Sequence, residues 1–103
     1  MIARVWRGWA PGEVADQYDA HYRTEVLEHL QGVTGFAGAR LLRRRDGDEV
    51  EFVSLTFFDG LEAVRAFAGS AYETAVVAEP ARELLSRFDE TVTHYDTSFT
   101  TSP

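Results

Sequence analysis

The sequence has 103 residues, 45% of them hydrophobic and 13% aromatic, and a formal net charge of −7. These values are typical of one globular domain over residues 1–103, and they exclude global disorder. The acidic balance argues against a nucleic-acid partner, and the lack of cysteine excludes disulfides, thiolate nucleophiles and cysteine–zinc sites.

The first third of the chain predicts a strand followed by a helix. Residues 1–9, MIARVWRGW, are rich in strand-forming residues. Residues 10–32 have the helical pattern, with Pro11 suited to the helix start and Gly32 to its end. Apolar residues recur along one face of this helix at four-residue intervals: Val14, Tyr18, Tyr22, Val26 and Leu30.

The rest of the chain predicts a β-hairpin, further helices and a last strand. The hairpin joins residues 36–45 to residues 49–58 through a turn that contains Asp46 and Gly47. Residues 59–69 predict a short helix that Gly69 ends. We expect further helix over residues 71–88, restarted at Pro80, then a strand over residues 90–100 that frays from residue 98 to residue 103.

This order of elements is that of a ferredoxin-like α+β fold, βαββαβ, with a four-stranded antiparallel sheet. In such a fold the helices cover one face of the sheet, yet these strands are apolar on both faces. Along residues 49–58, Phe52 and Phe58 are even-numbered and point to one face of the sheet. Val53, Leu55 and Phe57 are odd-numbered and point to the other face. An apolar sheet face left in water is an association surface, so the pattern predicts a homodimer closed sheet against sheet.

Three segments carry a resemblance to a known family. With MIARVWRGW at the start, LTFFDGLEAVRAFAG after the hairpin and VTHYD near the end, the chain resembles the antibiotic biosynthesis monooxygenase family. The resemblance extends to about Asp96 and implies a dimeric α+β barrel. The best-understood branch of that family oxidises anthrone-type aromatic polyketides with dioxygen and without metal or flavin.

The resemblance therefore implies a cofactor-independent, monooxygenase-like oxidoreductase that acts on a small aromatic or polyketide-type substrate. Several polar positions of the family differ here. Ser54 and Phe58 stand where that branch has an asparagine and a tryptophan, and Val64 stands where it has a tyrosine. The haem-degrading branch has an axial histidine at a position that corresponds to Val76, so the resemblance does not imply haem cleavage.

The stretch HYRTEVLEH raises the question of a metal site. His21, Glu25 and His29 follow one another at four-residue spacing. The two histidines are then about 12 Å apart along a helix, at roughly 1.5 Å per residue, which is too far for one ion to bridge. We therefore expect no metal, and the alternative is that Glu25 pairs with both histidines on a half-exposed surface.

Four residues are candidates for the chemistry of an enolisable substrate. His21 or His94 would remove a proton, because an imidazole titrates near neutral pH. Arg4 or Tyr72 would hold the resulting oxyanion. Each has a structural alternative: pairing with Glu25 for His21, a carboxylate partner for Arg4, packing for Tyr72, and a satisfied structural role for His94.

A pocket for a small aromatic ligand or substrate would lie beside these groups. Its expected lining consists of aromatic residues and one serine: Trp6, Tyr18, Tyr22, Ser54, Phe58 and Phe67. For Trp6 and Phe58 the alternative is a place in the core. The sequence leaves open whether the pocket belongs to an oxygenase, to a cyclase or isomerase, or to a non-catalytic binding protein.

The expected setting is a cytoplasmic protein that binds no cofactor, no nucleic acid and no membrane. The opening MIARVWRGW lacks the long apolar core of a secretion signal. Nothing in the sequence approaches the eighteen or so apolar residues that a membrane span requires.

Overall fold

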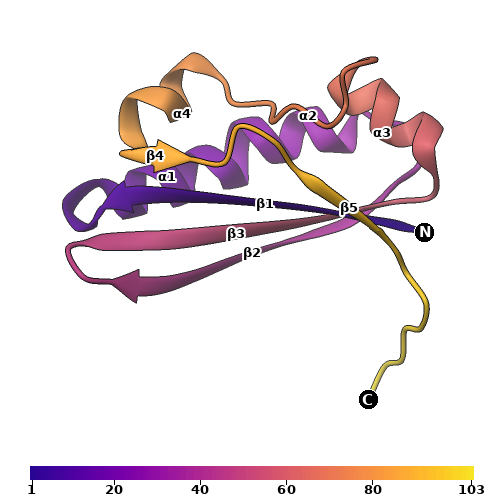
Figure 1. Ribbon diagram of the computed structural model, residues 1–103, viewed down its shortest axis with the longest axis horizontal. Coiled ribbons are helices and arrows are strands. Elements are labelled where there is room, and N and C mark those ends of the chain that lie inside the picture. Colours follow the sequence, from indigo (N-terminus) through magenta and orange to yellow (C-terminus); the bar gives the residue numbers. More distant parts are fainter.

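One antiparallel sheet carries helices on a single face in a computed structural model that describes residues 1–103 (Figure 1). The bounds of its strands are β1 (Ile2–Pro11), β2 (Phe36–Asp46), β3 (Glu49–Phe58), β4 (Arg87–Phe88) and β5 (Thr93–Asp96). The helices are α1 (Ala15–His21), α2 (Leu27–Gln31), α3 (Leu61–Ala68) and α4 (Glu79–Leu84), with a 3₁₀ turn at Gly12–Val14 and a π turn at Tyr22–Val26.

The strand order confirms the ferredoxin-like α+β fold. The sheet runs β2-β3-β1-β4, and β5 also pairs with β1. Because β3 occupies one edge of β1 from end to end, β4 and β5 lie one after the other along the opposite edge. Together they are the fourth strand, interrupted over residues 89–92.

The predicted hairpin is confirmed, with its register closed by the pair Asp46–Glu49. Gly47 has a φ of 64°, a left-handed conformation that a side chain makes costly. Asp46 and Gly47 therefore identified the turn correctly from the sequence.

Three predicted boundaries were wrong. Pro11 ends β1 instead of starting the helix, because its last pairing partner is Glu49 of β3. Residues 71–78 are not helical, since backbone hydrogen bonds join Ala75 to Glu90 and Val92 to Glu73. Only Glu79–Leu84 forms a helix there, and the regular part of the last strand is limited to Thr93–Asp96.

The helix after β1 widens at its centre. The amide of Leu27 donates to the carbonyl of Tyr22, a π-type contact. Residues spaced by four drift roughly 40° per step around an ordinary α-helix. The wider turn reduces this drift, and so Tyr18, Tyr22, Val26 and Leu30 all reach the same cavity.

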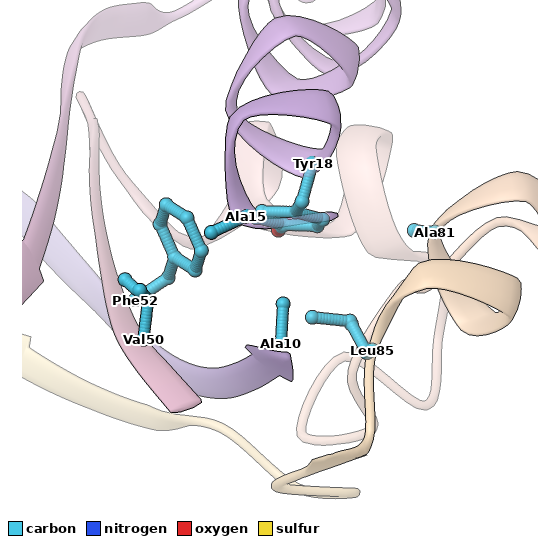
Figure 2. Packing of buried hydrophobic residues seen from close by; sticks show 7 residues of the cluster. All are labelled: Ala10, Ala15, Tyr18, Val50, Phe52, Ala81 and Leu85. Atoms are coloured by element: carbon cyan, nitrogen blue, oxygen red, sulfur yellow. The ribbon is translucent and has the colours of Figure 1, made fainter. Parts of the chain in front are cut away.

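Two groups of buried side chains join the helices to the sheet. Figure 2 shows the first group, in which the ring of Phe52 of β3 lies beside Ala15 and Tyr18 of α1, while Leu85 beyond α4 points toward Ala10. The ring centroids of Tyr18 and Phe52 are 4.8 Å apart. The second group contains Leu30, Phe58, Ala63 and Val64 and attaches α3 to the other end of the sheet.

The other face of the sheet carries no helix, as the view in Figure 1 shows. Cross-strand pairing places Leu42 opposite Val53, and Tyr95 opposite Ala3, on this face. We call it the open face. Its larger apolar side chains are Val5, Trp9, Leu42, Val53, Leu55, Phe57 and Tyr95, and the charged residues Arg7, Arg40, Arg44 and Glu51 lie on the same face. None of the helices is long and apolar enough to cross a bilayer.

Replacement of Phe52 by alanine tests the first core group. Phe52 is fully buried, so Phe52→Ala should lower the free energy of unfolding by about 3–5 kcal/mol through lost burial and a cavity. Urea denaturation at one protein concentration measures the loss. Phe99 is 80% exposed, so the matched variant Phe99→Ala should change the value by less than about 0.5 kcal/mol. Equal losses in the two variants would contradict this packing.

Candidate functional site

A small cavity lies between the helix after β1 and the helix-covered face of the sheet. Its volume is about 60 Å³, and 11 of its 15 lining residues are hydrophobic. Val76, Val77 and Ala78 close it from the irregular segment before α4. Seven of the residues proposed from the sequence line it: Arg4, Trp6, Tyr18, His21, Tyr22, Ser54 and Phe67.

His21 presents one free nitrogen to this cavity. Its side chain is 8% exposed, and Nδ1 lies 3.0 Å from Oε2 of Glu25. Nε2 is buried and has no hydrogen-bond partner in the protein. A carboxylate only accepts hydrogen bonds, so Nδ1 carries the proton and Nε2 of the neutral ring is a free acceptor. An unpaired buried acceptor in a cavity is a site for a ligand proton.

Hydroxyl groups form the polar part of the cavity floor. The hydroxyl of Tyr22 lies 3.0 Å from Oγ of Ser54, which lies 3.5 Å from Oγ1 of Thr56. These groups can reorient to donate or accept. Burial raises the pKa of Tyr18, so its hydroxyl stays protonated at neutral pH.

Arg4 is a buried cation whose hydrogen-bond partners are all neutral. Its side chain is 4% exposed, and it donates to the carbonyls of Tyr72 and Thr74 and to Nε2 of His94. The guanidinium also lies 5.5 Å from the ring centroid of Phe67. Burial lowers the pKa of Arg4 to about 10, so the group stays charged at neutral pH. A cation held this way favours an anionic group in the cavity.

His94 and Tyr72 lie beside Arg4 and not in the cavity lining. Nε2 of His94 is 3.1 Å from the guanidinium of Arg4, which only donates, so this nitrogen is occupied as an acceptor. The ring of Tyr72 packs edge-on against His94, at 5.5 Å between centroids. Burial, together with the charge of Arg4, lowers the pKa of His94. His94 is therefore neutral at pH 7 and engaged in holding Arg4.

Trp6 lines the cavity, whereas Phe58 lies behind Phe67 and does not reach it. The indole Nε1 of Trp6 donates to the carbonyl of Asp89 at 2.8 Å, in the interruption between β4 and β5. The indole also lies over Gly8, where a Cβ atom would be 2.5 Å from the ring. Phe58 is fully buried behind Phe67, with 5.8 Å between ring centroids, and does not line the cavity.

Several lining residues were not singled out from the sequence. Thr56 follows Ser54 at the two-residue spacing of a strand face, so strand parity could have identified it. Val76, Val77 and Ala78 were expected in a helix, and no local signal indicates that they cover a cavity. Their position follows from the backbone pairing of the preceding residues, 73–75, with residues 90–92, which is a tertiary effect.

The proposed pairing of Glu25 with both histidines holds for one of them. Glu25 contacts His21, whereas His29 packs on Phe67 with 4.9 Å between ring centroids. The structure contains no group of three or more His, Cys, Asp or Glu side chains that could hold a metal ion.

Comparison with known proteins relates this geometry to solved structures of the same fold. No family model and no curated protein matches the chain. The structure is similar to MhuD, a haem-degrader from Mycobacterium tuberculosis with two haems bound in its active site (TM-score 0.66, 18% identity, 99% of this chain and 100% of that one).

Two further solved structures show the same fold. A mutant of SnoaB, a cofactor-independent oxygenase from Streptomyces nogalater, has a TM-score of 0.69 at 16% identity and covers 96% of this chain and 94% of its own. A candidate antibiotic biosynthesis monooxygenase from Bacillus cereus has a TM-score of 0.69 at 12% identity, covering 99% and 95%. At these identities the similarity shows a shared fold, in agreement with the resemblance seen in the sequence.

The depressed pKa of His94 predicts a pH-dependent stability. The unfolded chain binds more protons than the folded chain between the lowered pKa and the ordinary value of 6.5. Above pH 6.5 His94 is neutral in both states and does not reduce the free energy of unfolding. As the pH falls from 6.5 through the lowered pKa, protonation of the unfolded chain reduces it. Urea denaturation from pH 7 to pH 5 measures the slope.

The variant His94→Gln supplies the comparison, because glutamine can still accept from Arg4 but does not titrate. Its loss of stability on acidification should be smaller than that of the parent. His29→Gln should keep the slope of the parent, since His29 is exposed. A parent and a His94→Gln variant with the same slope would show that His94 does not titrate as the geometry requires.

Proposed function

We propose that the protein is a cofactor-independent, monooxygenase-like enzyme that acts on a small aromatic or polyketide-type substrate. The observation that carries the proposal is the buried, unpartnered Nε2 of His21 in an apolar cavity. A base of this kind matches a substrate that must lose a proton before it reacts with dioxygen. The similarity in fold to SnoaB, a cofactor-independent oxygenase, supports the same class of chemistry.

In the proposed reaction, Nε2 of His21 accepts a proton from an activated CH₂ group of the substrate. The charge of Arg4 stabilises the resulting enolate or phenolate. The anion supplies electrons to dioxygen, and a peroxide forms at the carbon. Loss of water then leaves a carbonyl group, so that one CH₂ group and one O₂ give one C=O group and one H₂O.

The cavity volume sets a condition on this proposal. A volume of about 60 Å³ is well below the roughly 300–1,000 Å³ of typical ligand pockets. An aromatic substrate therefore has to displace part of the wall. The irregular segment with Val76, Val77 and Ala78 is the suitable part, because it has no helix or long strand to hold it in place.

Haem degradation does not fit these residues. Val76, at the position that corresponds to the axial histidine of the haem-degrading branch, has no atom that can ligate iron. The cavity is also small, and its lining is predominantly apolar. Haem therefore has no part in the proposed reaction.

The test of the proposed function is oxygen consumption with anthrone as the probe substrate. Loss of one general base typically reduces the rate by about 10² to 10⁴, and we expect His21→Ala to fall within this range. His29→Ala should stay within a few-fold of the parent, because its ring is outside the cavity lining. Product formation and oxygen uptake are measured together, so that their ratio checks the stoichiometry.

The same assay separates the alternatives. Equal rates in the parent and in His21→Ala would remove His21 as the base. Product without oxygen uptake would indicate a cyclase or isomerase. A parent that binds an anthrone tightly but does not turn it over would indicate a binding protein.

We propose in addition that a second copy of the chain covers the open face and so forms a homodimer. The observation is the row of apolar side chains along β1, β2 and β3 that no helix covers. Two such faces in contact would remove both rows from water.

A charge placed on the open face tests this assembly. Light scattering should give the parent about twice the 11.6 kDa of one chain. Leu42→Lys should shift the protein toward the monomer, because dimerisation would bury the charge. Val76→Lys is the control, since Val76 is as exposed as Leu42, at 48% against 47%, but lies on the helix side. A monomeric parent at micromolar concentration would overturn the proposal.

A further inference from the structure

We infer that Glu25 is a positioning residue that holds His21 in the tautomer needed for proton abstraction. The inference rests on the proposed function of His21 as the base. It goes further by assigning a role to an acidic side chain that lies outside the cavity lining.

The contact fixes which ring nitrogen carries the proton. Oε2 of Glu25 lies 3.0 Å from Nδ1 of His21, within hydrogen-bond distance. An ionised carboxylate has no proton to donate, so Nδ1 must be the donor. The alternative tautomer would place a lone pair of Nδ1 against the carboxylate and an unpaired N–H group in an apolar cavity. Both consequences are unfavourable.

The two side chains differ strongly in exposure. Glu25 is 63% exposed and His21 is 8% exposed. The carboxylate of Glu25 therefore lies in contact with water, while the ring that it orients is shielded from water. A carboxylate in this arrangement orients a buried imidazole and keeps the other nitrogen free, as the third member of a catalytic triad does.

Charge gives Glu25 a second role once His21 has taken a proton. The imidazolium would be a second buried cation on the lining that already contains Arg4, and Arg4 has no carboxylate partner. Glu25 is the acidic group in contact with His21. It therefore partly neutralises the imidazolium that proton transfer creates.

The wide helical turn supports the contact between these two residues. Glu25 lies within the π turn Tyr22–Val26, directly after His21. The hydroxyl of Thr24 hydrogen-bonds to the carbonyls of Ala20 and His21 at the start of this turn. Segments of this kind occur frequently at functional sites.

The first test measures the tautomer directly and needs no substrate. Nitrogen-15 NMR of the histidine side chains, at a pH where the spectrum shows a neutral His21 ring, should show Nδ1 protonated and Nε2 unprotonated for the parent. Glu25→Ala should give a mixture of tautomers. Glu25→Gln should keep the parent tautomer, because the amide oxygen still accepts from Nδ1–H. Glu28 is exposed and lies three residues after Glu25, so the control variant Glu28→Gln should leave the spectrum unchanged.

The second test uses the anthrone assay and compares kcat with KM. Glu25→Ala should lower kcat at least about tenfold with KM within a few-fold, because the interaction is strongest in the transition state. Glu25→Gln should retain more activity than Glu25→Ala but less than the parent, since it keeps the orientation and loses the charge. Glu28→Gln should match the parent.

A parent His21 with Nε2 protonated, or a Glu25→Ala variant with the kcat of the parent, would overturn the inference. If the parent does not turn over anthrone at all, the proposed function fails instead. The NMR result then decides the positioning role by itself, because it needs no turnover.

Discussion

The arrangement of the site depends on one buried cation without a buried anion beside it. Arg4 lies near the start of β1 and donates its hydrogen bonds to two carbonyls and one neutral imidazole. These contacts attach the irregular segment after α3 to the sheet. They also keep His94 neutral and occupied. The irregular segment after α3, which forms one wall of the cavity, is thus held by a few hydrogen bonds from Arg4. The positive charge of Arg4 has no carboxylate in contact with it.

The two faces of the sheet have separate roles that follow from strand parity. Even-numbered residues of β1 and β3, such as Arg4, Trp6 and Ser54, face the helices and contribute to the cavity. Odd-numbered residues, such as Val5 and Leu55, face away from the helices. A shift of register by one residue would exchange these sets. The long β1–β3 ladder therefore fixes the position of the site as well as the fold.

The sequence was sufficient for the fold class, the hairpin and much of the cavity lining, because periodicity and turn chemistry are local properties. It failed for residues 71–78, where pairing with residues 90–92 replaces the expected helix. It also left His21 and His94 as equal candidates for the base. Which of two imidazoles has a free nitrogen depends on partners distant in the chain, and only the folded structure shows that Arg4 occupies His94. The four-residue spacing of Tyr18, Tyr22, Val26 and Leu30 also fits the apolar stripe of an ordinary helix, which is about 100° wide or more, so the wide turn could not be predicted from it.

Gly8 determines how the shape of the cavity responds to substitution. The indole of Trp6 lies over Gly8, in space that any Cβ atom would occupy. Even an alanine at position 8 would therefore displace the indole, which lines the cavity and donates to the carbonyl of Asp89, and would alter the shape of the cavity. A substitution at position 8 would therefore act on the cavity through Trp6 and not through His21 or Arg4. Selection or laboratory evolution can use it to change which molecules the cavity admits while His21 and Arg4 stay in place.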